Sequence, residues 1–393
     1  MAYVSESDRP LFTSLQYCIR CGMPSTEEGL TFDEMRICTL CRSSEQKMRI
    51  SWKERDEALR DILSRYRGRD PRNYDCIVPI SGGKDSAFQL YLLTHVYGMK
   101  PLAVTFSHNW FSPTGEYNLR WCLDTFRVDH VMFTPNRDVI GRIARRSLEM
   151  IGDSCWHCHA GVGAFPFQVA VRFGIPLLVW GESAAEMSGM ADYEKLLECN
   201  RDYYATLSPR FEAPALVCDY LSEQDLTPFH MPSVEEIARV GVVGIHIGNY
   251  VFWDHERQME FLRDRFGWRE DHVEGTYKCY KSVECRMPGV HDFTKFLKRG
   301  FGRATDHVAQ DVRAGLMTLE EGWGLIREND PARPGALDEY LRITGYSEAQ
   351  FYEIMDGHRR QIELAHGGPT RDEIEAALAD SRETEVRARR DGR

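Results

Sequence analysis

Six residues, SGGKDS at positions 81–86, lie where a strand is expected to turn into a helix. The apolar run at 74–80 predicts a buried strand, and apolar side chains recur at helical spacing over 87–98. Glycine lets the backbone approach a ligand closely, and the unpaired N–H groups of a first helical turn attract anions. The spacing differs from that of a Walker A loop. The segment therefore predicts a phosphate-binding turn inside an α/β fold.

The alternation of strands and helices continues beyond this turn. Further apolar runs predict strands at 101–107, 129–135, 176–182 and 242–247. Helical periodicity predicts helices at 116–127, 137–151 and 160–173. Strands separated by helices of this length form parallel sheets with both faces covered. We therefore predict a doubly wound, parallel-sheet α/β domain at 73–255.

Smaller regions flank this domain. We expect a cysteine-bearing module at 1–50, a helical linker at 51–72 and a mainly helical C-terminal domain at 256–393. Four pairs have the spacing of helix capping boxes: Ser233/Glu236, Thr318/Glu321, Ser347/Gln350 and Thr370/Glu373. Residues 381–393 are almost all polar or charged, and we expect this tail to be frayed.

The module at 1–50 contains two Cys-x2-Cys pairs that are separated by sixteen residues. This spacing is typical of a zinc ribbon, in which four thiolates bind one Zn²⁺ tetrahedrally. So short a segment buries little core, and a metal supplies the stability that packing cannot. We predict a structural zinc site whose ligands are Cys18, Cys21, Cys38 and Cys41.

Charge and composition narrow the class of protein. The formal net charge of −11 argues against a general nucleic-acid binder, which needs a broadly basic face. No apolar run is long enough to predict a membrane span, and the N-terminus lacks the basic and apolar regions of a signal peptide. Twelve cysteines without an export signal are expected in a reducing compartment. We expect a cytoplasmic protein that partners neither nucleic acid nor membrane.

The hexapeptide resembles the signature of PP-loop ATP pyrophosphatases. That resemblance implies that ATP phosphates, bridged by Mg²⁺, are held by Ser81, Gly82, Gly83, Lys84, Asp85 and Ser86, while a substrate oxygen attacks the α-phosphate. In this class the adenine lies along the second strand, which implies Ser107 and Asn109 as nucleotide contacts; a structural role for Asn109 is the alternative.

Glu182 closes the fourth predicted strand, the position where α/β enzymes place chemistry. Its carboxylate would orient Mg²⁺ or an incoming amine, or would simply stand at a helix N-terminus. With Lys84 and Asp85 it completes the predicted catalytic set.

A third Cys-x2-Cys pair, Cys155 and Cys158, lies within the segment CWHCH. Packing near a helix start is one explanation, and a metal or cluster site completed by Cys279 or Cys285 is another. Some PP-loop tRNA thiolation enzymes bind an iron–sulfur cluster with such a pair and a distant cysteine. An iron–sulfur cofactor and a sulfur-transfer reaction therefore stay open as alternatives.

Residues 289–307, GVHDFTKFLKRGFGRATDH, concentrate basic side chains within an acidic protein. A solvated helix face is the ordinary explanation for such charge, but glycines at 300 and 302 break the helix. A basic pocket for a phosphorylated or nucleotide-linked substrate is the alternative. Its candidate ligands are His291, Lys295, Arg299, Arg303 and His307.

Four segments in this order resemble the N-acetyl sugar amidotransferase family of bacterial surface polysaccharide and nonulosonic acid biosynthesis. They are the paired cysteines, SGGKDS, PLLVWGE at 176–182 and the segment 289–307. The resemblance covers most of 15–360. It implies an ATP-dependent, AMP-forming conversion of an N-acetyl group to an acetamidino group, on a free or nucleotide-linked sugar.

The ammonia for that reaction is expected from a separate glutaminase, because the chain shows no GxSxG elbow and no glutaminase signature. Two other functions compete with amidotransfer. One is a sulfur-transferring PP-loop enzyme, and the other is a non-catalytic nucleotide-binding module.

Overall fold

A computed structural model describes residues 9–187, 191–194, 200–207 and 209–390 of the chain. At its centre is a five-stranded parallel sheet with the strand order β3-β2-β1-β4-β5. The strands are β1 (Cys76–Pro79), β2 (Pro101–Phe106), β3 (Asp129–Phe133), β4 (Leu177–Trp180) and β5 (Val243–His246). All of the predicted strands are present, and the α/β prediction is confirmed.

The chain changes direction across the sheet beside β1. Ile77 of β1 pairs with Leu102 of β2 on one side and with Leu178 of β4 on the other. Loops that leave the carboxyl ends of β1 and β4 therefore diverge, and open α/β sheets bind their ligands in the crevice formed there. SGGKDS follows β1 and Glu182 follows β4, so the fold brings both segments to this crevice.

Both faces of the sheet are covered by helices. Ile77 and Leu178 pack into one core together with α5 (Arg137–Ile151) and α6 (Trp156–Phe173). Their strand neighbours Cys76, Val78 and Val179 pack into a second core. That core includes side chains from α2 (Trp52–Ser64), α3 (Lys84–Tyr91), α4 (Pro113–Phe126) and α10 (His255–Phe266). Successive strand residues point to opposite faces, so this division shows a doubly wound sheet.

Three helices begin earlier than their apolar periodicity predicts, and one of them, α4, starts at Pro113 rather than at residue 116. Helix α3 starts at Lys84, directly after the glycines, and continues as a π-helix, η2 (Leu92–Val96). Helix α6 starts at Trp156 rather than at residue 160, which places Cys158 in its first turn. Periodicity recognises only the apolar stripe, and the side chains of these first turns, apart from Trp156, are mostly polar or small.

Short elements connect β4 to the rest of the sheet. They are α7 (Ala184–Met187), η3 (Tyr203–Leu207), η4 (Ala213–Leu216), α8 (Glu223–Leu226), η5 (Thr227–Phe229), α9 (Val234–Val240) and, after β5, η6 (Ile247–Asn249).

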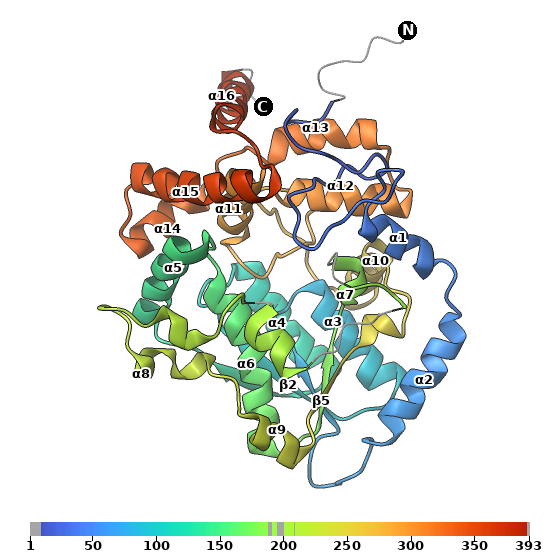
Figure 1. Cartoon of the computed structure of the whole chain (residues 1–393). Helices are drawn as coiled ribbons and strands as arrows, with labels where there is room; N and C mark the ends of the chain where they lie inside the picture. The colour runs from blue at the N-terminus through green and yellow to red at the C-terminus, as the bar shows by residue number, and fades with distance from the viewer. Residues whose placement is uncertain (1–8, 188–190, 195–199, 208, 391–393) are drawn as a thin grey trace.

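The N-terminal module packs against the C-terminal helices. Its cysteines share a small core with Phe301 and with Ala309 of α12 (Arg303–Ala314), and its helix is α1 (Thr39–Lys47). Arg299 pairs with Glu28 of the module, and the Thr26 hydroxyl donates to the Arg299 carbonyl at 2.6 Å. Figure 1 shows the module, in blue, beside α12 and α13.

The C-terminal part is helical, as predicted. It contains α11 (Pro288–Arg299), α12, α13 (Leu319–Asn329), α14 (Ala336–Thr344), α15 (Glu348–His366) and α16 (Arg371–Arg390). These helices, orange to red in Figure 1, gather at one end of the molecule above the sheet. All four predicted capping boxes form, with hydrogen bonds in both directions.

The prediction of a frayed tail is wrong for residues 381–390, which continue α16. Helical pairing within the tail explains the difference. Arg387 lies 3.2 Å from Glu383 one turn earlier, and the Thr384 hydroxyl donates to the Asp380 carbonyl at 3.0 Å. Among the described residues, no helix is both long and apolar enough to cross a membrane.

Candidate active site

The turn after β1 can be made only with glycine at position 82. Gly82 has a φ of +89°, and a Cβ there would lie 2.8 Å from the carbonyl oxygen of Gly115 and the amide nitrogen of Leu119. The Trp268 indole N–H donates to the Gly82 carbonyl at 3.0 Å and holds the turn from the opposite side. The sequence-based interpretation of this glycine as a close-approach position therefore agrees with the geometry.

The two serines of SGGKDS organise the turn around the start of α3. The Ser86 hydroxyl accepts the Ser81 N–H at 3.3 Å and donates to the Gly83 carbonyl at 2.9 Å. Gly83 is the N-cap of α3 and contributes no side-chain cap. The first N–H groups of the helix are therefore available for an anionic ligand.

A compact group of charged side chains stands beside this helix start. The buried Lys84 ammonium pairs with the Asp85 carboxylate and lies 2.9 Å from Nδ1 of His255. The Lys281 ammonium lies 3.2 Å from the same Nδ1, and Oε1 of Glu182 lies 3.3 Å from it. The structure thus brings Lys84, Asp85 and Glu182 together, and His255 and Lys281 lie among them.

Burial and the charges of neighbouring groups shift the pKa values of the side chains in this cluster. Burial raises the pKa of Glu182 to about 7, and the Asp85 charge adds to this effect while Lys281 and Lys84 oppose it. Burial also raises the pKa of Asp85, but Lys84 and His255 outweigh it and hold that pKa well below its usual range. Burial and the two lysines lower the pKa of His255. At neutral pH the imidazole is therefore uncharged, and Nδ1 can accept hydrogen bonds from either ammonium.

A third carboxylate faces the loop. Oε2 of Glu284 is buried without a hydrogen-bond partner among the described residues, and it lies 3.1 Å from where a Cβ on Gly83 would be. Burial raises the pKa of Glu284. Ligand atoms of Asp85, Glu182 and His255 lie within 4.8 Å of one another. Carboxylate oxygens beside a phosphate loop fit Mg²⁺, which takes oxygen ligands and bridges phosphates.

Ser107 and Asn109 lie just beyond β2, at the carboxyl edge of the sheet. The Ser107 hydroxyl accepts the Asn109 N–H at 3.2 Å. Asn109 has a φ of +66°, and its side-chain amide donates to the Pro135 carbonyl at 2.9 Å. The Asn109 side chain thus ties this turn to the exit of β3, which is a structural role.

Each of the five predicted substrate ligands has a different partner. These pairs are His291 with Asp153 (3.2 Å), Lys295 with Asp306, Arg299 with Glu28, Arg303 with Asp292, and His307 with Thr276 (2.6 Å). Arg299 connects α11 to the N-terminal module. Arg303 and His307 instead lie near the loop cluster. The Arg303 guanidinium donates to the hydroxyl of Ser282, the neighbour of Lys281, at 2.7 Å, and the charge of Lys281 contributes to lowering the pKa of His307.

The pair formed by Cys155 and Cys158 lies at the start of α6, with Cys155 as the N-cap of the helix. Burial raises the pKa of Cys155 and of Cys158. The charge of Cys285 also raises the pKa of Cys155, and the charge of Cys158 raises that of Cys285. Of the two predicted third partners, Cys285 packs against the same hydrophobic core as Cys155 and Cys158, whereas Cys279 is exposed.

The four cysteines of the N-terminal module form a buried group whose sulfurs lie within 4.8 Å of one another. The Sγ atoms of Cys18 and Cys41 are 3.8 Å apart, and those of Cys21 and Cys38 are 3.6 Å apart. Four sulfurs at about 2.3 Å from one Zn²⁺ would be about 3.8 Å apart. The Arg313 guanidinium approaches Cys21 Sγ at 3.6 Å, which favours thiolate. The residues therefore fit a tetrahedral zinc ion.

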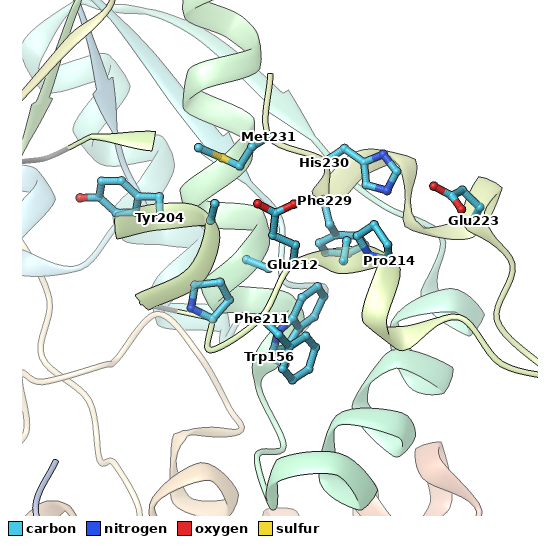
Figure 2. Close-up of a pocket in the computed structure, with 13 residues that line it drawn as sticks. Trp156, Tyr204, Phe211, Glu212, Pro214, Glu223, Phe229, His230 and Met231 are labelled. Atoms are coloured by element: carbon cyan, nitrogen blue, oxygen red, sulfur yellow. The ribbon is translucent and has the colours of Figure 1, made fainter. Parts of the chain in front are cut away.

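A separate cavity of about 210 Å³ lies beside α6, away from the phosphate loop. Figure 2 shows its aromatic wall, in which the rings of Trp156 and Phe211 stack at 5.3 Å, with the Glu212 side chain between them and Met231. An aromatic wall with two carboxylates, Glu212 and Glu223, suits an apolar or sugar ring better than a phosphate.

Comparison with known proteins supports the interpretation of the C-terminal part. Residues 274–364 match the family model "LPS biosynthesis protein WbpG-like, C-terminal domain". This confirms the resemblance to surface-polysaccharide proteins in the region that contributes Lys281, Glu284, Arg303 and His307. No curated protein sequence matches the chain.

Among solved structures, the chain is similar to NMN synthetase from Francisella tularensis. The identity is 12%, and the match covers 54% of this chain and 82% of that one with a TM-score of 0.23. A score this low carries no structural argument, so the fold assignment depends on the observed sheet.

Three residues of the site were not identified from sequence: His255, Lys281 and Glu284. His255 begins α10, and Lys281 and Glu284 lie in a loop before α11 that has no periodic pattern. The one available signal was the density of charged residues at 278–286. Because these charged residues are far from SGGKDS in the sequence, their density alone did not indicate that they lie beside the phosphate loop.

Proposed function

We propose that this protein is an ATP-dependent, AMP-forming amidotransferase of bacterial surface polysaccharide biosynthesis, which converts an N-acetyl group on a sugar to an acetamidino group. One observation carries the proposal. Lys281 and Glu284 belong to the segment that matches a polysaccharide-biosynthesis domain, and they lie beside the SGGKDS loop and its neighbour His255. The nucleotide site and the sugar-related segment would then form one active site.

The chemistry explains why such a reaction needs ATP. The acetamido oxygen would attack the α-phosphate, forming a new P–O bond while the bond to the β-phosphate breaks and pyrophosphate leaves. Ammonia would then add to the activated carbon, and AMP would depart with the former acetamido oxygen as a proton is lost. The amide oxygen, a very poor leaving group, thereby becomes part of a stable phosphate ester.

The residues of the cluster would divide this work. Lys84, Lys281 and the α3 N-terminus would bind the phosphates and favour the charge that develops as pyrophosphate leaves. Asp85, Glu182 and Glu284 would hold Mg²⁺, which supplies charge neutralisation between the phosphates. Arg303 and His307 would contact the sugar or its nucleotide carrier. Ammonia would come from a separate glutaminase.

A sulfur-transfer reaction is the second candidate. The observation in its favour is that Cys155, Cys158 and Cys285 pack in or against one hydrophobic core. Such a set would hold an iron–sulfur cluster or carry a persulfide. In that case a sulfur donor would be required, and ammonia would not support turnover.

Isotope transfer tests the proposal. The full-length protein is incubated with Mg²⁺, ATP, ammonia and a panel of free and nucleotide-linked N-acetyl sugars carrying ¹⁸O in the acetyl group. We expect labelled AMP, pyrophosphate and acetamidino product in equal amounts, with the Lys84→Ala variant as the inactive reference. Unlabelled AMP beside an amidinated product would refute adenylation of the amide, and formation of ADP would indicate a kinase. No nucleotide turnover with any sugar would favour a non-catalytic binding module.

A further inference from the structure

Two imidazoles and a carboxylate meet outside the phosphate-loop cluster. Asp153 lies in the loop between α5 and α6, His159 in the first turn of α6, and His291 in the first turn of α11. One ligand atom from each of the three residues lies within 4.8 Å of the other two. The proposed reaction uses neither Asp153 nor His159.

We propose that Asp153, His159 and His291 bind a first-row divalent transition ion such as Zn²⁺, distinct from both the four-cysteine site and the Mg²⁺ site. Two imidazoles with one carboxylate are the donors that zinc and its neighbours prefer, whereas Mg²⁺ and Ca²⁺ favour all-oxygen sites. Three protein ligands leave at least one coordination position for water or a substrate atom, as in catalytic rather than structural zinc sites.

The geometry of the one measured pair suits an ion. Oδ1 of Asp153 lies 3.2 Å from Nδ1 of His291. An ion about 2.1 Å from both atoms would be bound at an angle of about 100°, within the range of tetrahedral coordination. The side chains of Asp153 and His291 are 18% and 27% exposed, so the ion would be partly shielded yet accessible.

The carboxylate is held in place by its own loop. Oδ1 of Asp153 accepts the Cys155 N–H at 2.7 Å, and the Asp153 carbonyl accepts the Ser147 hydroxyl at 2.7 Å. These contacts fix the loop against α5 and direct the carboxylate toward α11. Backbone contacts of this kind orient a metal ligand and lower the cost of ordering it on binding.

Two cations stand beside the three ligands. The positive charge of Lys298 acts on Asp153, and that of Arg303 acts on His159. Both charges oppose every divalent cation alike, so selectivity would come from the two imidazole nitrogens, which suit first-row transition ions better than Mg²⁺ or Ca²⁺.

Zinc stoichiometry of matched variants tests the site. Full-length wild-type protein, His159→Ala, Asp153→Asn and the control His272→Ala are incubated with Zn²⁺, separated from free metal by gel filtration and analysed for bound zinc. Asn at position 153 keeps a carbonyl oxygen that can accept the Cys155 N–H, and His272 is an exposed histidine outside the three-residue group. We expect about two equivalents in wild type and control, and about one in both site variants.

Replacing zinc with cobalt shows which of the two sites has lost its metal ion in each variant. The thiolate-to-cobalt absorption of the four-cysteine site should remain in His159→Ala and Asp153→Asn, while the weaker bands of a nitrogen and oxygen site should disappear. Retention of the thiolate signal also shows that the variants are folded. A single equivalent in wild type, or equal zinc content in wild type and both site variants, would overturn the proposal whatever the reaction of the enzyme is.

Discussion

The Lys281 ammonium lies 3.8 Å from the Glu182 carboxylate, so a loop before α11 meets the end of β4 at the phosphate loop. Both side chains are largely buried, at 11% and 18% exposure. Burial raises the pKa of Glu182 to about 7, while Lys281 and Lys84 act to lower it. Lys281, from the C-terminal part of the chain, therefore contributes to the charge balance in the crevice, where burial and Asp85 have larger effects on Glu182.

Glu182 gives a pH dependence of stability. Its folded pKa of about 7 lies above the unfolded value, so the folded state retains a proton that the unfolded state loses between about pH 4.5 and 7. Folding stability should therefore fall as pH rises through that window. In urea unfolding of the Mg²⁺-free protein, the free energy of unfolding of Glu182→Gln should rise relative to that of wild type between pH 5 and 7.5, by on the order of 1–3 kcal/mol. A constant difference between the two proteins would contradict the raised pKa.

Lys84 should dominate nucleotide binding. Replacing it with alanine removes a charge-assisted phosphate contact of about 1.5–3 kcal/mol, which weakens ATP about ten- to hundredfold. Calorimetry with ATP and Mg²⁺ measures the change. Lys53→Ala is the matched control, since that side chain is 87% exposed on α2. Unchanged affinity in a folded Lys84→Ala variant would remove this lysine from the phosphate site.

The stability of the N-terminal module should depend on a zinc ion bound by its four cysteines. Cys38→Ser should contain about one zinc fewer than wild type and lose the thiolate-to-cobalt absorption. Its thermal midpoint should fall by roughly 5 °C or more, because the module shares its core with Phe301 and Ala309. Cys279→Ser, at an exposed cysteine, should behave like wild type. Equal zinc in both variants would place the metal elsewhere.

Variants of Cys155 and Cys158 distinguish nitrogen transfer from sulfur transfer. If nitrogen is transferred, the double variant Cys155→Ser, Cys158→Ser should keep ammonia-dependent AMP formation within about threefold of wild type, because the thiols take no part in adenylation. Steady-state kinetics with excess ammonia measures this. Loss of turnover in a folded double variant, together with a requirement for a sulfur donor, would support sulfur transfer instead.

Local patterns were enough to predict much of the fold. The strands, the turn after β1, the four capping boxes and the cysteine spacing all depend on neighbouring residues, whose geometry follows from backbone and side-chain chemistry within a few positions. The same holds for Lys84, Asp85 and Glu182, which stand at strand ends. Parallel strands bring those ends to one edge, so their proximity followed from the strand order.

Packing between distant segments decided the rest of the site. His255, Lys281 and Glu284 reach the phosphate loop only because α10 and the loop before α11 fold back over the sheet. The same packing gave Arg299 a partner in the N-terminal module while Arg303 stayed near the crevice. No spacing in the sequence encodes such contacts, since they depend on how whole helices pack and on which buried charges each surface must pair.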